Sequence, residues 1–305
     1  MVPDRPGSTH YAHNGEVDIA YEDLGDPGGE PLLLVMGLGV SRFWWPAGLV
    51  AELAARGFHV AAFDQRDAGE SSHLPDTGAS SPIAAVLRRR SAAYDAEDMT
   101  DDAVAVMDAL GWDRAHLFGH SMGGQLAQRT ALRHPGRVLS ITSSASLPSD
   151  AGGLRAGRYV HLGLVARMAR MKFPEGRDGD IALGLALARA VASPGYPFDE
   201  TEVRERIERD LVSGVRDTRA QSRQAGAKWH GGRLGQLRVP TLVLHGEADP
   251  LLRPAAARDT AAAIDGARLV ILSGVGHDLP RGVWPQVADE VRALADCAPR
   301  DAAVT

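Results

Sequence analysis

Ala115-His-Leu-Phe-Gly-His-Ser-Met-Gly-Gly124 is the stretch of sequence that decides the fold. It begins as a short apolar run, and a helical pattern follows over residues 122–134. The turn between them reads Gly-x-Ser-x-Gly, a pattern that carries little weight alone in a chain with 34 glycines. Between a buried strand and a helix, however, such a turn holds its serine on a strained backbone with the hydroxyl exposed. We therefore predict that Ser121 is a nucleophile.

A serine hydroxyl is a weak nucleophile and needs a base. Among the 11 histidines, His277 follows the last apolar run, which places it at the carboxyl end of a strand, the same sheet edge as Ser121. His120 is adjacent to the serine but is expected to point the other way, and His245 still belongs to a strand end. We predict that His277 is the base.

The base in turn needs a carboxylate that orients the imidazole and stabilises its cation. Glu247 and Asp249 both follow the apolar run at 241–244. Asp249 is the better candidate, because Pro250 closes the loop there and a helical pattern begins just beyond it. Glu247 remains the alternative.

The oxyanion that forms during acyl transfer needs backbone N–H donors held in place. One is expected from Met122, the residue after the nucleophile, because a helix N-terminus presents free N–H groups. The second is expected in the loop Met36-Gly-Leu-Gly39, which follows an apolar run, and we assign it to Leu38.

Short apolar runs alternate with helical patterns through most of the chain. Such runs are typical of strands buried on both faces of a parallel sheet, and the alternation indicates a doubly wound α/β fold. The expected strands are 31–36, 58–63, 115–118, 138–142, 241–244 and 267–272, with an added antiparallel strand at 16–22. The expected helices between them are 44–56, 95–110 and 122–134.

The alternation stops between residues 147 and 236, where helical patterns at 159–173, 181–191 and 199–214 occur without convincing strands. This segment carries 15 basic and 11 acidic residues, whereas the rest of the chain carries 18 and 28. Open α/β sheets bind ligands at the carboxyl edge of their strands. We therefore interpret residues 147–236 as a helical cap domain over that edge, and residues 1–146 and 237–305 as the core domain.

Several large apolar side chains are candidates for the wall of a substrate pocket. The pattern at 159–173 is a mostly one-sided stripe, of which part is expected to pack within the cap and part, including Met168, to face the pocket. Phe198 and Trp229 are expected on the same wall. Trp44 and Trp45 follow the oxyanion loop, and either wall the pocket or begin a core helix.

Composition limits the partners and cofactors. The net charge of −6 argues against general nucleic-acid binding. Residues 1–15 lack the apolar core of a signal peptide, and the longest strongly apolar run, 32–36, is far too short to span a bilayer, so we expect a cytoplasmic protein without membrane contact. Because Cys297 is the single cysteine and no cluster of metal ligands is convincing, we expect no metal and no cofactor.

Five motifs in order resemble the α/β-hydrolase superfamily, from about Glu16 to Leu294. They are Leu33-Leu-Val-Met-Gly37, Asp64-Gln-Arg-Asp-Ala-Gly-Glu-Ser71, Gly119-His-Ser-Met-Gly123, Leu244-His-Gly-Glu-Ala-Asp249 and Gly276-His277. The order of the serine, the aspartate and the histidine along the chain is also that of this superfamily. The resemblance implies an α/β-hydrolase fold, with a mostly parallel eight-stranded sheet flanked by helices and an inserted helical cap.

Two residues depart from the usual superfamily motifs and point to one group within the superfamily. Met36 stands where the superfamily usually has histidine, and Asp67 stands where it usually has glycine. Both residues, together with the segments 102–108 and 113–116, are similar to the aclacinomycin methylesterases, which remove a methyl ester from an anthracycline polyketide. The resemblance therefore implies a serine esterase, with a methyl ester of a hydrophobic, polyketide-like acid as its substrate.

The residues themselves support hydrolysis of a small hydrophobic carboxylic ester through an acyl-enzyme. Other members of the superfamily use the same machinery as perhydrolases, carbon–carbon hydrolases, acyltransferases and cofactor-free lyases, and the triad does not separate these reactions. A third hypothesis is a non-catalytic module that binds ligands on a hydrolase scaffold. The intact triad argues against it.

Overall fold

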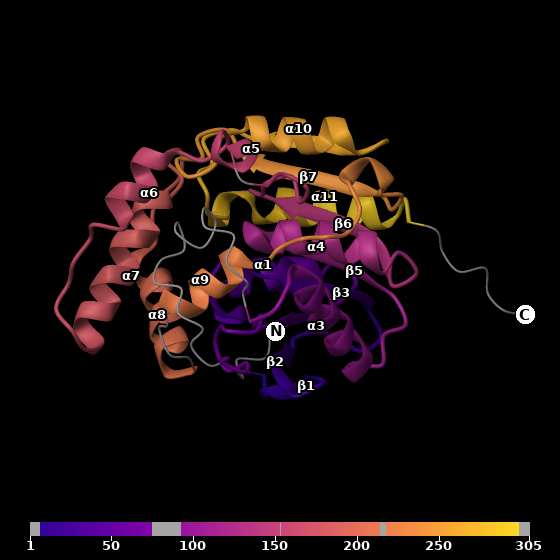
Figure 1. Cartoon of the computed structure of the whole chain (residues 1–305), viewed down its shortest axis with the longest axis horizontal. Coiled ribbons are helices and arrows are strands. Elements are labelled where there is room, and N and C mark those ends of the chain that lie inside the picture. The colour runs from indigo at the N-terminus through magenta and orange to yellow at the C-terminus, as the bar shows by residue number, and fades with distance from the viewer. Residues whose placement is uncertain (1–6, 75–92, 153, 214–217, 299–305) are drawn as a thin grey trace, which may run out of the picture.

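An eight-stranded sheet forms the centre of the computed structural model, which describes residues 7–74, 93–152, 154–213 and 218–298 (Figure 1). The strand order is β1-β2-β4-β3-β5-β6-β7-β8. The strands are β1 (His10–Asn14), β2 (Val17–Asp23), β3 (Glu30–Val35), β4 (Phe58–Phe63), β5 (Ala115–His120), β6 (Val138–Ser144), β7 (Thr241–Gly246) and β8 (Arg268–Leu272). From β4 to β8 all neighbours are parallel, whereas β2 pairs antiparallel with β1 and with β4. The predicted fold class, a mostly parallel α/β sheet, is confirmed.

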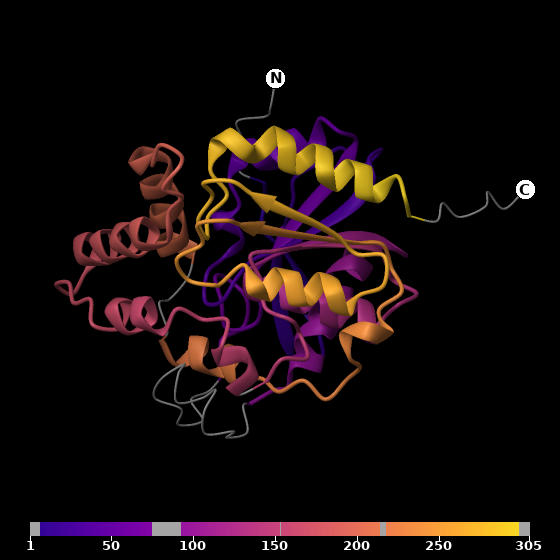
Figure 2. The ribbon, with the colours of Figure 1, turned by 90° about the horizontal axis from the view of Figure 1, so that it is seen from above.

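Helices cover both faces of this sheet (Figure 2). One face is covered by α1 (Ala47–Ala54) and α11 (Trp284–Ala295), and the other by α3 (Ala96–Ala109), α4 (Met122–Arg133) and α10 (Ala255–Ala263). Strand β3 shows why both faces are apolar. Leu32 and Leu34 pack under α1 and α11, whereas Leu33 and Val35 pack under α3 and α4, as the two-residue period of a strand requires.

The inserted helices lie between β6 and β7 in the chain. They are α5 (Leu154–Gly157), α6 (Leu162–Met168), α7 (Arg177–Val191), α8 (Glu200–Ser213) and α9 (Thr218–Gly226), followed by the single turn η2 (Leu234–Gln236). In Figure 2 the arrowheads of β7 and β8 point toward α6–α8, so these helices lie beyond the carboxyl ends of the strands. An apolar cluster of Ile181, Leu185, Val203 and Ile207 holds α7 against α8.

The predicted helix over 44–56 is wrong at its start. The chain forms a 3-10 turn, η1 (Arg42–Trp44), and α1 begins only at Ala47. The cause is Pro46, because a proline ring disfavours helical geometry in the residue before it. Trp45 is accordingly extended, with φ −66° and ψ 122°.

The predicted helix over 159–173 is also wrong, because only residues 162–168 are helical there. Tertiary contacts with the segment before α10 replace the first turn. Val160 forms an antiparallel bridge with Leu252, and the Tyr159 hydroxyl donates a hydrogen bond of 2.6 Å to Asp259 on α10. The other two predicted helices of the segment agree with α7 and α8, except that residue 214 lies outside the described residues.

Candidate active site

The turn at Ser121 joins β5 directly to α4. Ser121 is the N-cap of α4 and has φ 56° and ψ −122°, a backbone conformation that residues other than glycine rarely adopt. The flanking glycines are required by space. A Cβ on Gly119 would lie 2.1 Å from the carbonyl oxygen of Gly123, and one on Gly123 would lie 2.0 Å from the carbonyl oxygen of Val35. The two glycines thus make room for a strained turn with Ser121 between them.

The structure brings together Ser121, His277 and Asp249. The distance from His277 Nε2 to Ser121 Oγ is 3.0 Å, and that from His277 Nδ1 to Asp249 Oδ2 is 2.7 Å. An ionised carboxylate only accepts hydrogen bonds, so Nδ1 carries the hydrogen and donates it to Asp249. The lone pair of Nε2 then faces the serine hydroxyl, which is the arrangement that a general base requires.

Asp249 is almost completely buried, with 4% of its surface exposed, and both carboxylate oxygens are occupied. Oδ1 accepts the N–H groups of Leu251 and Leu252, each at 2.8 Å, while Oδ2 faces His277 and lies 3.4 Å from Nε2 of His245. Burial raises the pKa of the Asp249 carboxyl, but attraction to His277 and the accepted hydrogen bonds outweigh burial and hold that pKa below its ordinary value. The carboxylate is therefore ionised and fixed in orientation.

The alternative residues occupy other positions. The Glu247 carboxylate accepts a hydrogen bond of 2.8 Å from the Ser273 hydroxyl at the surface. His120 lies below the triad, where its Nε2 donates to the carbonyl oxygen of His277 at 2.9 Å. Burial, with the nearby His277 ring as a second cause, lowers the pKa of His120 to about 3. His120 therefore supports the histidine loop as a neutral ring.

The two segments that carry the predicted oxyanion donors both come close to Ser121. Met122 is the first residue of α4, so its N–H is one of the free donors at that helix N-terminus. The loop that carries Leu38 passes close to the serine, since a Cβ on Gly37 would lie 3.1 Å from Ser121 Cβ. The Gln65 side chain fixes the start of this loop by donating to the carbonyl oxygen of Met36.

The end of α7 supports the loop that carries His277. The His277 N–H donates a hydrogen bond of 2.9 Å to the carbonyl oxygen of Val191. The Ser193 hydroxyl accepts the N–H of Gly276 at 2.8 Å and donates to the carboxylate of Asp278. The inserted segment thus holds the backbone of the histidine that faces Ser121.

The five predicted pocket residues are dispersed. Trp45 is 4% exposed and lies in the core, edge-on to Phe118 at 5.0 Å between ring centroids. Trp44 packs on the α7–α8 cluster, and its Nε1 donates to Asp210 at 3.2 Å. Phe198 packs on the same cluster, and Met168 is half-buried in the last turn of α6.

Trp229 packs beside the middle of α4. Its ring stacks under the guanidinium group of Arg129, with 5.7 Å between the guanidinium carbon and the ring centroid. Arg129 is eight residues beyond Ser121 on α4, which corresponds to about 12 Å along a helix. The structure therefore places Trp229 in a different region from Trp44 and Phe198.

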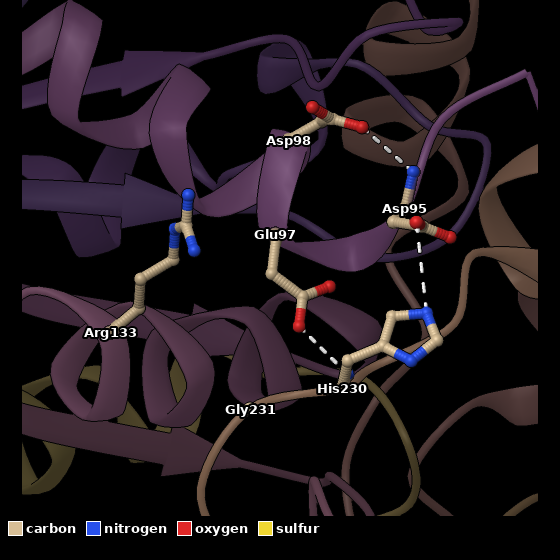
Figure 3. Close-up of a pocket in the computed structure, with 6 residues that line it drawn as sticks. All are labelled: Asp95, Glu97, Asp98, Arg133, His230 and Gly231. Carbon is tan, nitrogen blue, oxygen red and sulfur yellow. Dashed lines mark hydrogen bonds and ion pairs between the residues drawn. The ribbon is translucent and has the colours of Figure 1, made fainter.

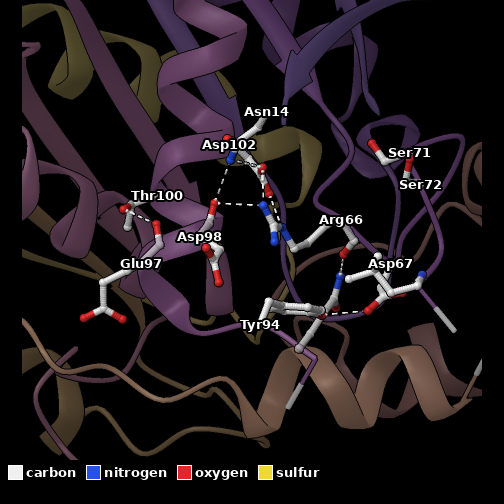
Figure 4. A network of polar contacts seen from close by, with 12 residues as sticks. Asn14, Arg66, Asp67, Ser71, Ser72, Tyr94, Glu97, Asp98, Thr100 and Asp102 are labelled. Carbon is white, nitrogen blue, oxygen red and sulfur yellow. Dashed lines mark hydrogen bonds and ion pairs between the residues drawn. The ribbon is translucent and has the colours of Figure 1, made fainter. Parts of the chain in front are cut away.

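The loop at 64–71 is tied into the core by buried ion pairs. Arg66 donates two hydrogen bonds to Asp102, at 2.6 and 2.7 Å (Figure 4). Asp67 has a positive φ of 66° and accepts the Tyr94 hydroxyl at 2.8 Å. It also accepts two hydrogen bonds of 2.8 Å from Arg223 of α9. A glycine at position 67 would form neither contact, so this loop binds the inserted segment through the aspartate.

A separate surface pocket of about 420 Å³ lies at the start of α3 (Figure 3). It is lined by Asp95, Glu97, Asp98, Arg133, His230 and Gly231. Arg133 is at the opposite end of α4 from Ser121, so this pocket is not part of the triad region. Within the described part of the chain, no group of three or more histidine, cysteine or carboxylate residues is arranged to hold a metal ion. None of its helices is both long and apolar enough to span a bilayer.

The protein-family model for the alpha/beta hydrolase fold matches residues 30–280 of this chain. The chain belongs to the α/β-hydrolase family. It is 30% identical to rhodomycin D methylesterase DauP of Streptomyces sp. (strain C5) and, to the same extent, to rhodomycin D methylesterase DnrP of Streptomyces peucetius. Each alignment covers 93% of this chain and 97% of the relative.

A solved member of the same fold is esterase RhEst1 from Rhodococcus sp. ECU1013. The two structures superpose with a TM-score of 0.74 at 22% identity, over 96% of this chain and all of the other. The match extends through the inserted helices as well as the sheet, because it leaves only 4% of the chain uncovered.

Proposed function

We propose that this α/β hydrolase is a serine carboxylesterase with Ser121 as nucleophile, His277 as base and Asp249 as the orienting acid. The observation that carries the proposal is the continuous chain of hydrogen bonds from the serine hydroxyl to the buried carboxylate, with heavy-atom distances of 3.0 and 2.7 Å. The strained backbone at Ser121 supports it, because such strain persists where the surrounding structure enforces it and is typical of functional sites.

The acylation step follows from this geometry. Ser121 Oγ attacks the ester carbonyl carbon while its proton passes to His277 Nε2. The carbonyl oxygen becomes an oxyanion, which we expect the N–H groups of Leu38 and Met122 to stabilise. When the tetrahedral intermediate collapses, His277 gives its proton to the leaving alkoxide, which departs as an alcohol.

Deacylation repeats these steps with water. His277 takes a proton from water as the water oxygen attacks the acyl carbon, and then returns that proton to Ser121 Oγ. The products are a carboxylic acid and an alcohol, and no cofactor takes part. Asp249 stays ionised throughout and stabilises the imidazolium that forms in each half-reaction.

The substrate that we infer has a bulky hydrophobic acyl group and a small alcohol such as methanol. The relatives at 30% identity support this, because both are named as rhodomycin D methylesterases. We further infer that residues 147–236 act as a cap domain over the sheet edge. The apolar cluster of α7 and α8, against which Trp44 and Phe198 pack, is the region that we expect to contact the acyl group.

Two measurements test this function. A fluorophosphonate probe should label the wild-type protein and not Ser121→Ala, and that variant should lose roughly 10⁴- to 10⁶-fold in kcat while it keeps its melting temperature. In a set of esters with acyl and alcohol groups varied separately, kcat/KM should stay constant or rise as the acyl group grows, and should fall as the alcohol group grows. Esterase activity retained by Ser121→Ala contradicts the mechanism, and a preference for small acyl groups with large alcohols contradicts the substrate.

A further inference from the structure

We propose that Gln224, on the inserted helix α9, is a positioning residue for the oxyanion hole. The inference rests on the serine-esterase function proposed above. Gln224 is 3% exposed, and both ends of its side-chain amide are used. Oε1 accepts the N–H of Gly39 at 2.9 Å, and Nε2 donates to the carbonyl oxygen of Arg66 at 2.7 Å. One side chain thus joins the oxyanion loop to the loop that follows β4.

The contact at Gly39 lies one peptide beyond the proposed donor, the N–H of Leu38. Gly39 is the residue after Leu38 and has φ +66°, a conformation that favours glycine, so the hydrogen bond from Gln224 holds a turn directly after Leu38. Helix α9 packs against this glycine, since a Cβ there would lie 2.3 Å from Cγ of Gln221. Gln65 holds the loop at Met36, so the Leu38 peptide lies between two side-chain amide anchors.

Helix α9 is itself fixed in position. Arg223, the neighbour of Gln224, forms the paired hydrogen bonds to Asp67 at 2.8 Å, and both side chains are buried. Asp67 is held in turn by the Tyr94 hydroxyl (Figure 4). Because removal of one partner from a buried ion pair strongly destabilises a protein, Arg223 and Asp67 are poor choices for a test of catalysis. Gln224 is uncharged and can be replaced by a residue of similar shape.

An oxyanion hole acts mainly in the transition state, and this determines the expected effect on kcat and KM. Its donors stabilise the negative charge of the transition state far more than the neutral ester, so a displaced donor lowers kcat and leaves KM nearly unchanged. Complete loss of one donor costs about 10²- to 10³-fold. A donor that is only displaced should cost less, and we expect kcat to fall about 10- to 100-fold without Gln224.

The experiment compares Gln224→Met with Gln221→Met. Both replace a glutamine on the same helix beside the same glycine, but only the first removes the hydrogen bond to Gly39. Gln224→Met should lower kcat by at least tenfold at constant KM, and weaken binding of a trifluoromethyl ketone, whose adduct with serine carries an oxyanion, by a similar factor. Gln221→Met should change both by less than threefold. If Gln224→Met does not fold, Gln224→Asn replaces it in the experiment, because the asparagine side chain is one methylene shorter and cannot reach both Gly39 and Arg66.

The outcomes separate this inference from the proposed function. Equal kcat values in the two methionine variants, with normal fluorophosphonate labelling, overturn the role of Gln224 and leave the esterase intact. A rise in KM at constant kcat also overturns it, since that result assigns Gln224 to substrate binding. A wild-type protein that neither labels nor hydrolyses esters overturns the function and this inference with it.

Discussion

Asp249→Asn replaces one oxygen of the buried carboxylate by an NH₂ group, and the surrounding donors decide which one. Oδ1 accepts two backbone N–H groups, from Leu251 and Leu252. An NH₂ group there would leave both donors unpaired, at roughly 1–3 kcal/mol each. The asparagine oxygen must therefore stay at this position, and its NH₂ group must face Nδ1 of His277.

This orientation reverses the histidine. An NH₂ group donates, so Nδ1 of His277 must become the acceptor and the hydrogen must move to Nε2. Nε2–H then points at Ser121, 3.0 Å away, and cannot take the serine proton. Presenting the wrong tautomer costs about 10⁴-fold in kcat, which corresponds to ~5.5 kcal/mol of transition-state stabilisation. The backbone contacts survive, so the free energy of unfolding should change by only about 1 kcal/mol.

The assay is kcat on the best ester of the panel, with melting temperature as the measure of folding. Glu247→Gln is the matched control, because it makes the same chemical change on the same loop, at a carboxylate that contacts Ser273 at the surface, where the glutamine amide can still accept that hydroxyl. It should change kcat by less than about threefold. The reasoning fails if Asp249→Asn keeps a tenth of wild-type activity, or if Glu247→Gln is the more damaging variant.

Three further predictions concern Ser193, the Asp67–Arg223 ion pair and the pH dependence of stability. Ser193→Ala removes one support of the histidine loop while the Val191 carbonyl remains, so kcat/KM should fall about 2- to 10-fold, and an unchanged value would remove Ser193 from the site. Asp67→Asn leaves Arg223 buried without its counter-ion, and urea unfolding should show a loss of about 3–5 kcal/mol; a loss below 1 kcal/mol would contradict the importance of this pair. The lowered pKa of Asp249 contributes stability that is present above the ordinary carboxyl pKa and is lost as the pH falls through the lowered value. Melting temperatures from pH 6 to pH 3 should therefore fall less steeply for Asp249→Asn than for the wild type, and parallel curves would show that Asp249 is not a stabilising carboxylate.

The sequence predicts the sheet and the turn at Ser121 well, because local rules determine both. Buried parallel strands are continuous apolar runs, and Gly119 and Gly123 are required by backbone atoms less than 2.5 Å from where a Cβ would lie. β1 was not predicted, because this edge strand is short and mostly exposed, with polar residues such as His10 and Asn14.

The inserted segment is less predictable, since its structure depends on distant contacts. The one-sided stripe at 159–173 predicts a helix, but Val160 pairs instead with Leu252, 92 residues later in the chain. Gln224 and Ser193 belong to no motif, and their neighbours in the sequence give no sign of a role. Only the folded chain brings them to Gly39 and Gly276, at separations of 185 and 83 residues.

The His277 N–H bonded to the carbonyl oxygen of Val191 has a consequence for protein engineering. Exchanging lids between related hydrolases is an attractive way to change substrate range, and it assumes that lid and catalytic core are independent modules. In this chain the inserted segment, which we propose is the lid, supplies a main-chain acceptor to the proposed base, and no side-chain substitution in the core can restore it. A chimera therefore has to retain Val191, or recreate its carbonyl at the same point, if the recipient is to keep this support for His277.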